Sequence, residues 1–255
     1  PAVFAGHGSP MNAIEDNPFH RSLREIARGI PPPRAILCIS AHWETDGVSI
    51  TASPKPSTIH DFHGFPRALH EVQYPTPGDP ALARRIAAML PGGAHLDEAR
   101  GLDHGSWGIL LPMYPEAQIP VVQLSLHRRQ PPSWHYALAQ SLAPLRQQGV
   151  LIIGSGNIVH NLARIDFASP HGAPWADDFN NAVKQRIVTD DHDALTQFHS
   201  LTPEARLAVP TPEHFLPLLY VLGVRRPDDT IAWFNDQTTL GSISMTSFVL
   251  NAQAG

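Results

Sequence analysis

The stretch Ala2-Val3-Phe4-Ala5-Gly6-His7-Gly8-Ser9-Pro10 joins a short apolar run to a turn built from glycine, serine and proline. An apolar run bounded by turn residues predicts a buried strand. His7 stands directly after that strand. A histidine in this position means little by itself, but the chain repeats the arrangement.

Two later segments show the same order of apolar run, turn and histidine. Residues 35–40 (Ala-Ile-Leu-Cys-Ile-Ser) lead to His42, and residues 150–153 (Val-Leu-Ile-Ile) lead through Gly-Ser-Gly-Asn to His160. Both apolar runs predict buried strands. We therefore interpret the rest of the chain as a scaffold that brings these histidines together.

Helices are predicted between the strands. Asn17-Pro18 is typical of a helix start, with Asn as the N-cap and Pro at the first helical position, and Asp79-Pro80 repeats the signal. Strand, helix, strand is the order of a βαβ unit, whose parallel strands are covered by helices. We expect an α/β fold in which residues 1–255 form a single domain, with a mostly parallel or mixed central sheet covered by helices. The 255 residues, 42% of them hydrophobic, suffice for one core.

Composition argues against several classes of partner. The formal net charge is -5, only 16% of residues are charged, and no run of Lys or Arg exists, which disfavours nucleic acid and anionic membranes. No apolar run approaches the length of a membrane span, and no signal peptide is visible. The single cysteine, Cys38, lies in a predicted buried strand and fits a reducing compartment. We therefore expect a cytoplasmic location.

The histidines are the unusual feature of the composition. His7, His42 and His160 each follow a predicted strand at its carboxyl end, where open α/β sheets bind ligands. Thr211-Pro212-Glu213 predicts a helix start, and His214 in its first turn could reach the same crevice. Neutral imidazole suits Fe, Zn and Cu, so the pattern favours a divalent metal site at the carboxyl ends of the strands. The alternative is that each histidine is a hydrogen-bonded core or loop residue.

Two further segments hold candidate residues. Leu102–Gly108 reads as a polar turn flanked by glycines, and its His104 could orient a substrate or serve the turn itself. The long loop over residues 53–78 contains His60, Asp61, His63 and His70, and loops of this length often form a lid or a binding wall. His60 and His63 are more typical of surface histidines than of ligands.

Some aromatic and basic side chains could contact a substrate. Trp43 and Trp107 could wall an aromatic pocket or could be ordinary core residues. Arg67, Arg128 and Arg129 are candidates to bind a carboxylate, although most exposed arginines only interact with solvent.

Some catalytic motifs are absent from the sequence. There is no Gly-x-Ser-x-Gly nucleophile elbow, no His-Glu-x-x-His helix and no Cys-x-x-Cys pair. Gly154-Ser155-Gly156-Asn157 follows a strand as phosphate loops do, but it lacks their lysine and third glycine. Nucleotide binding is therefore a weak hypothesis.

Five motifs together resemble those of the LigB-type (class III) extradiol ring-cleavage dioxygenases, and most closely the branch similar to 4,5-DOPA extradiol dioxygenases. They occur in the family's order from residue 6 to residue 214. They are Gly6-His7-Gly8-Ser9-Pro10, Ser40-Ala41-His42-Trp43, Leu102-Asp103-His104-Gly105-Ser106-Trp107-Gly108, Gly156-Asn157-Ile158-Val159-His160-Asn161 and Pro210-Thr211-Pro212-Glu213-His214. Residues 241–245 also resemble the family's last strand.

The resemblance implies a non-haem metal-dependent dioxygenase that opens the ring of a DOPA-like catechol with O2. It implies one divalent ion per chain, Fe(II) for the dioxygenase chemistry or Zn(II) as the bound metal, held by His7, His42 and His214. His160 would be the acid/base residue beside the substrate, or a fourth ligand when substrate is absent. His104 would line the substrate side. The wider superfamily usually has a carboxylate where this chain has His214.

Two other functions remain open at this point. A zinc-dependent hydrolase on the same scaffold would use His160 to activate a metal-bound water, without any need for O2. A non-catalytic metal-binding protein would show no turnover with any metal.

Overall fold

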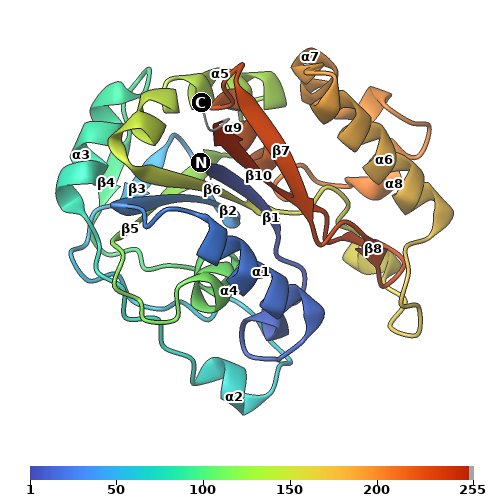
Figure 1. Cartoon of the computed structure of the whole chain (residues 1–255), viewed down its shortest axis with the longest axis horizontal. Coiled ribbons are helices and arrows are strands. Elements are labelled where there is room, and N and C mark those ends of the chain that lie inside the picture. The colour runs from blue at the N-terminus through green and yellow to red at the C-terminus, as the bar shows by residue number, and fades with distance from the viewer. Residues whose placement is uncertain (253–255) are drawn as a thin grey trace.

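The structure is a computed structural model in which residues 1–252 are described, and its centre is an eight-stranded sheet (Figure 1). The last three residues of the predicted domain, 253–255, lie outside the described part. The strands of this sheet are β1 (Ala2–Gly6), β2 (Ala35–Thr45), β3 (Ser49–Thr51), β4 (His95–Asp97), β5 (Val121–His127), β6 (Val150–Gly156), β7 (Asp229–Phe234) and β10 (Ser247–Ala252).

The sheet is mixed, with the order β4-β3-β5-β2-β6-β1-β10-β7. The central strands β5, β2, β6 and β1 are parallel to one another. β10 and β7 extend the sheet antiparallel on one side, and β3 pairs antiparallel with β5 on the other. The predicted α/β fold with a mixed central sheet is confirmed. A two-stranded ribbon, β8 (Thr238–Thr239) with β9 (Ile243–Ser244), stands beside the main sheet.

Helices cover both faces of the sheet. They are α1 (Pro18–Gly29), α2 (Arg67–His70), α3 (Pro80–Met89), α4 (His104–Met113), α5 (Pro132–Gln140), α6 (Pro174–Val188), α7 (His192–Thr196), α8 (Ala205–Ala208) and α9 (Leu216–Gly223), with the 3₁₀ helices η1 (Pro10–Ala13), η2 (Ala143–Gln148), η3 (Leu162–Arg164) and η4 (Phe198–Ser200). Of the helices in residues 1–252, none combines the length and the hydropathy that crossing a bilayer requires.

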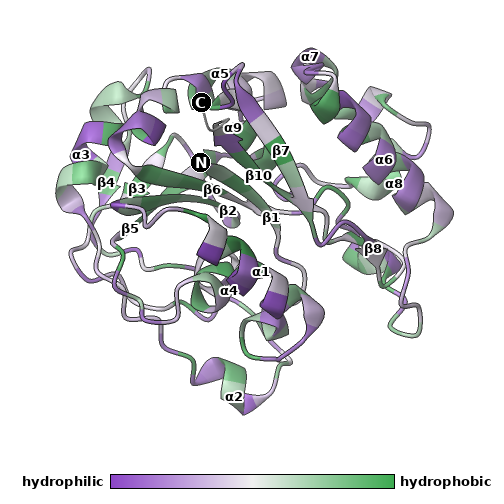
Figure 2. Cartoon of the chain, viewed as in Figure 1, coloured by the Kyte–Doolittle hydropathy of each residue, from purple (hydrophilic) through white to green (hydrophobic). Residues whose placement is uncertain are grey.

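The core has one layer on each face of the sheet. Successive strand residues point to opposite faces, so Leu37 packs with α3, α5, α6 and α9 while its neighbour Cys38 packs with α1 and α4. Figure 2 shows the hydrophobic central strands between helices that carry hydrophilic residues outward. The predicted helix starts are confirmed, because Asn17 accepts a hydrogen bond from the His20 N–H and Asp79 accepts one from the Leu82 N–H.

Three local predictions near the histidines were wrong. β2 does not end at Ser40 but continues through His42 to Thr45, with a bulge relative to β5 between Ile39 and Glu44. His42 therefore lies within a strand. The bulge is what allows the strand to stay paired with β5 beyond the histidine.

Leu102–Gly108 is not a polar turn, because α4 begins inside it at His104. Asp103 is the N-cap and accepts a hydrogen bond from the Ser106 N–H. Gly105 serves close packing rather than a turn, since a Cβ there would lie 2.8 Å from Cδ2 of His42 and still closer to the Ser40 hydroxyl. The glycine lets the first turn of α4 rest directly on β2.

Thr211-Pro212-Glu213 does not start a helix either. α9 begins at Leu216, and the Leu216 N–H donates to the Pro212 carbonyl, so His214 lies in the turn before the helix. The His214 carbonyl accepts a hydrogen bond from the Asn157 N–H at 2.8 Å, which ties this turn to the end of β6. Backbone pairing with the sheet, rather than the N-cap signal, decides where His214 lies.

Candidate metal centre and substrate cavity

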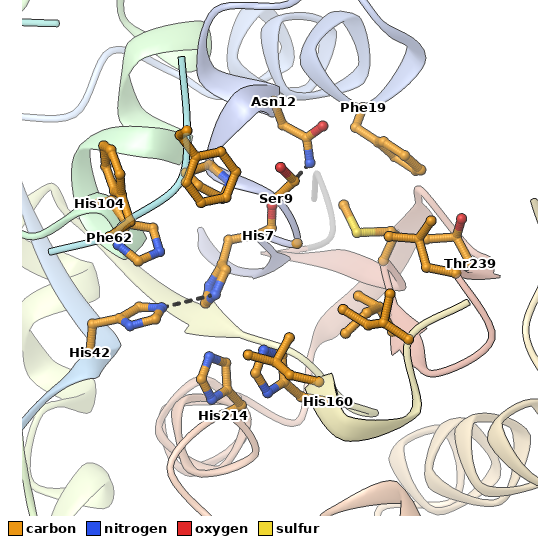
Figure 3. Close-up of a pocket in the computed structure, with 18 of the residues that line it drawn as sticks. His7, Ser9, Asn12, Phe19, His42, Phe62, His104, His160, His214 and Thr239 are labelled. Atoms are coloured by element: carbon orange, nitrogen blue, oxygen red, sulfur yellow. Dashed lines mark hydrogen bonds between the residues drawn. The ribbon is translucent and has the colours of Figure 1, made fainter. Parts of the chain in front are cut away.

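A cavity of about 590 Å³ lies at the carboxyl ends of β1, β2 and β6 (Figure 3). Five histidines line it. His7 follows β1, His42 belongs to the end of β2, His104 opens α4, His160 lies four residues after β6, and His214 comes from the turn before α9. The structure thus brings together all the histidines that the sequence singled out as ligands or catalytic residues.

Three of the rings form a nearly equilateral triangle. The ring centres of His7 and His42 are 5.0 Å apart, those of His7 and His214 are 5.3 Å apart, and those of His42 and His214 are 5.0 Å apart. The Nε2 atoms of His7 and His42 are separated by only 3.2 Å. Two facing imidazole nitrogens at this distance share either a proton or a cation.

Hydrogen bonds define the tautomer of His7. The Oγ atom of Ser155 lies 3.0 Å from Nδ1 of His7. Ser155 donates its only hydroxyl proton to the Gly105 carbonyl, so its oxygen must accept a proton from Nδ1. The Nε2 of His7 therefore carries a lone pair that faces the cavity. Burial, followed by the neighbouring His42 and His214, lowers the pKa of His7 well below its usual range and keeps this ring neutral.

Asp61, from the long loop, orients two more rings. Its Oδ1 accepts the His104 backbone N–H at 2.9 Å and lies 3.0 Å from the His104 Nδ1. Its Oδ2 lies 3.8 Å from the His42 Nδ1. Burial would raise the pKa of Asp61, but the hydrogen bonds from His104 outweigh burial and hold the pKa at about 2. The carboxylate is thus ionised and attracts the Nδ1 protons of both rings.

Glu213 performs the same task for His214. Its Oε1 lies 3.1 Å from the His214 Nδ1, and the pKa of Glu213 is about 2, because the hydrogen bond from His214 outweighs the effect of burial. The Nδ1 of His214 consequently carries the proton. Its Nε2 is buried and has no hydrogen-bond partner among the described residues. An unpaired buried acceptor is costly, which indicates that another group normally occupies this position.

These histidines have the surroundings that metal-binding histidines usually have. Metal-binding histidines usually donate their second ring N–H to a carboxylate or another acceptor, and His7, His42 and His214 each have such a group near Nδ1. Two histidine nitrogens that bind the same ion with tetrahedral geometry are about 3.3 Å apart. The separation of 3.2 Å between the Nε2 atoms of His7 and His42 matches this value.

His104 competes with His214 for the third ligand position. One ring nitrogen from each of His7, His42 and His104 lies within 4.8 Å of the other two, a grouping that could hold a metal. The ring centre of His104 is 4.0 Å from that of His42 but 6.0 Å from that of His7, so it lies to one side of the triangle described above.

His160 lies flat against His214. Their ring centres are 3.5 Å apart and their planes differ by 4°. Burial and the adjacent His214 lower the pKa of His160 to about 3, so the ring is neutral near pH 7. Figure 3 shows both rings at the same side of the cavity, opposite Phe19 and Asn12.

Several other side chains differ from the expectations. Trp107 is fully buried, where it donates its Nε1 hydrogen to the Ile59 carbonyl, and Trp43 lies under the Arg100 guanidinium, so both are core aromatics. Phenylalanines wall the cavity instead, among them Phe19 and Phe62.

The arginines considered for a substrate carboxylate lie elsewhere. Arg67 pairs with Glu71, and Arg128 and Arg129 pair with Asp46. Asp61 is the site residue that sequence reasoning missed. Its position in a long loop crowded with histidines was the one available signal.

Comparison with known proteins agrees with this geometry. The protein family described as "Catalytic LigB subunit of aromatic ring-opening dioxygenase" matches residues 1–250 of the chain. The chain belongs to this family.

Relatives in the LigB family extend over nearly the whole chain. A protein of Escherichia coli K12 named 4,5-DOPA dioxygenase extradiol is 45% identical over 97% of this chain and 93% of its own. A protein of Beta vulgaris with the same name is 40% identical over 96% of both chains. A crystal structure of an uncharacterized protein from Escherichia coli K12 superposes with a TM-score of 0.84 at 40% identity, covering 97% of this chain and 98% of that one.

LigB family membership decides between the functions that the sequence left open. The protein is an extradiol dioxygenase, an oxidoreductase that opens an aromatic ring with O2 at a non-haem metal. The hydrolase and the non-catalytic alternatives are set aside. The cluster of His7, His42 and His104 could bind the metal that this chemistry needs.

Proposed function

We propose that the protein opens the ring of a catechol, with L-DOPA among its substrates, at a divalent ion held by His7, His42 and His214. The observation that carries this proposal is the triangle of these three rings, each with an acceptor near Nδ1. L-DOPA is included because the relatives of 40–45% identity are named for it. Fe(II) in this position would supply the electron transfer between catechol and O2.

His160 is the acid/base residue of this proposal. The rings of His160 and His214 are stacked, with centres 3.5 Å apart and planes that differ by 4°, so the lone pairs of their ring nitrogens lie in parallel planes and do not converge on one point. This arrangement favours proton transfer over the role of fourth ligand. The neutral ring can accept a catechol proton at a ring nitrogen and return it later.

His104 takes the substrate side. The Asp61 carboxylate accepts its backbone N–H and lies 3.0 Å from its Nδ1, which favours a proton on Nδ1 and a lone pair on Nε2. From this position it can accept a hydrogen bond from a bound catechol hydroxyl. Phe62, whose ring centre lies 5.5 Å from that of His104, then covers one face of the site and helps to exclude water.

The test is reconstitution with Fe(II) under anaerobic conditions, followed by O2 uptake with unsubstituted catechol and L-DOPA. We expect O2 consumption with the Fe(II) protein and none with a Zn(II) sample prepared in parallel. Absence of O2 uptake in the Fe(II) protein with every catechol, at full metal occupancy, would refute the proposal.

We further propose that residues 1–255 form one such domain, that it acts in the cytoplasm, and that nucleic acid is not a partner. The family match over residues 1–250 supports the first point. Cys38 is free and buried, which suits a reducing compartment. The net charge of -5 disfavours binding to a polyanion.

A further inference from the structure

The cavity has two chemically different ends. The histidines and Asp61 occupy one end, while apolar side chains form the other. This outer wall consists of Phe19, Phe65, Leu162, Phe167 and Leu240. Among the residues that the structure describes, neither lysine nor arginine lines the cavity. A substituent on the ring of a bound catechol would therefore meet hydrocarbon rather than a cation.

The polar groups in the rest of the cavity do not replace a cation, since Ser9 and Thr239 offer only neutral hydroxyls. The amide of Asn12 is already engaged, because its Nδ2 donates to the His7 carbonyl and its Oδ1 accepts from Asn17. Asp61 is a carboxylate and would repel an anionic substituent. A carboxylate against this surface would give up part of its hydration without gaining a charged partner, which is unfavourable.

Leu240 provides the second observation. Its φ is +53°, a left-handed conformation that leucine adopts only at a cost in stability, and it precedes Gly241 in the turn between β8 and β9. Glycine or asparagine would suit this position better. Backbone strain of this kind tends to be retained where the side chain serves function, and this side chain lines the cavity.

The turn at Leu240 is also joined to the loop that carries Phe167. The Leu240 N–H donates to the Ser169 carbonyl at 3.1 Å, and its own carbonyl accepts from the Asp166 N–H at 2.9 Å. Leu240 and Phe167 are thereby held at the same rim of the cavity. Phe167 is 85% exposed and Leu162 is 64% exposed. Large apolar side chains so exposed around a cavity indicate a surface that a ligand covers.

We propose that Leu240, with Phe167 and Leu162, selects catechols whose ring substituent is uncharged and apolar, such as an alkyl group. Catechols with a carboxylate, L-DOPA included, are then weaker substrates of the same reaction. This inference rests on the proposed function, because it concerns which catechol the ring-opening site prefers.

The first experiment measures kcat/KM for O2 uptake by the Fe(II) protein with a series of catechols. We expect kcat/KM to rise about three- to fivefold per methylene from catechol through 4-methylcatechol to 4-ethylcatechol. We expect 3,4-dihydroxyphenylacetate and L-DOPA to be at least about tenfold below 4-ethylcatechol. Carboxylated catechols that equal or exceed 4-ethylcatechol would overturn the inference while leaving the ring-opening function intact.

A binding measurement separates this inference from the proposed function. Calorimetric titration of the Zn(II) protein with 4-ethylcatechol and 3,4-dihydroxyphenylacetate reports preference without turnover. If no catechol consumes O2 but 4-ethylcatechol binds at least about tenfold more tightly, the ring-opening proposal fails and the selectivity stands. Equal affinities would refute the selectivity.

The second experiment changes Leu240 itself. We expect Leu240→Gly to raise or maintain Tm, because the strained backbone is relieved, and to lower the ratio of kcat/KM for 4-ethylcatechol over catechol about tenfold. Ala117→Gly is the matched control, since Ala117 has φ of +48° but does not line the cavity, and the ratio should not change. If Leu240→Gly left the ratio of kcat/KM for 4-ethylcatechol over catechol unchanged, Leu240 would not determine which catechol the site prefers.

A gain-of-function variant completes the test. Leu240→Arg places a guanidinium on the outer wall and should raise kcat/KM for 3,4-dihydroxyphenylacetate relative to 4-ethylcatechol by at least about tenfold. If Leu240→Arg folds with a normal Tm but keeps the parent's preference for 4-ethylcatechol over 3,4-dihydroxyphenylacetate, Leu240 does not contact the ring substituent.

Discussion

The hydroxyl oxygen of Ser155 lies 3.0 Å from Nδ1 of His7 and accepts its proton, while the same hydroxyl donates to the carbonyl of Gly105. One serine thus fixes both the tautomer and the tilt of a candidate metal ligand. It also joins β6 to the first turn of α4.

Ser155→Ala should weaken metal binding about 10- to 100-fold, because the Nδ1 proton of His7 loses its acceptor and the ring is free to turn. The measurement is the Kd for Zn(II) in competition with a chromogenic chelator. Ser125→Ala is the control, since Ser125 is also buried and hydrogen-bonded but lies under Thr45 and Ser49. Equal Kd values for Ser155→Ala and the parent protein would contradict the assigned role.

Alanine variants of the histidines separate ligands from their neighbours. We expect His42→Ala and His214→Ala to lose the metal, because each removes an Nε2 from the triangle of rings. His104→Ala should keep it, because His104 lies to one side of that triangle. Metal content per chain, measured by plasma emission spectrometry after dialysis, gives the answer. If His104→Ala lost the metal and His214→Ala kept it, His104 would be the third ligand.

His160→Gln should retain the metal and lose turnover. Glutamine keeps much of the size of the side chain but cannot take up a catechol proton, and general acid/base residues contribute about 10²- to 10⁴-fold. Metal content and kcat for O2 uptake are measured on the same sample. Full activity in this variant would rule out His160 as the acid/base residue.

The Asp61 carboxylate should make the metal-free protein sensitive to acid. Its folded-state pKa of about 2 is depressed below the ordinary value of 3.8. Its stabilising effect is therefore present above about pH 4 and is lost as the pH falls toward 2. Urea unfolding of the metal-free parent and of Asp61→Asn, at pH 5 and at pH 3, measures the difference in free energy. The difference in the free energy of unfolding between the two proteins should be smaller at pH 3 than at pH 5. A difference that does not change with pH would show that the carboxylate does not stabilise the fold in this way.

The sequence predicted the parts of the site that follow strands. His7 and His160 come after apolar runs whose pairing in a parallel sheet places their carboxyl ends at one edge, and this geometry follows from spacing and polarity alone. His214 was predicted from a helix start at Thr211-Pro212-Glu213 that the structure does not form, and its role as a metal ligand came from the resemblance. A backbone hydrogen bond from Asn157 holds His214 in its position, and local sequence propensities do not predict a contact between segments so far apart.

Asp61 and the outer wall of the cavity could not be predicted in the same way. Asp61 lies in a loop without periodic pattern, and its partner His104 is 43 residues away. Leu240 and Phe167 belong to a turn and a loop that are joined by backbone hydrogen bonds between segments far apart in the sequence. The prediction of a turn at Gly105 was wrong, because the sequence does not distinguish a glycine that bends the chain from one that lets two elements pack closely.

That contact between α4 and β2 has a practical consequence for protein engineering. With no side chain at Gly105, the main chain of α4 lies directly against the side chains of Ser40 and His42, and the Ser40 hydroxyl also donates to Asp103. The buried leucines on the opposite face of the sheet, Leu82 of α3 and Leu138 of α5, take no part in this contact, so we expect changes there to leave the spacing between His42 and His104 intact. A single methyl group at position 105, by contrast, would collide with Ser40 and His42 and lift α4, with His104, away from the sheet.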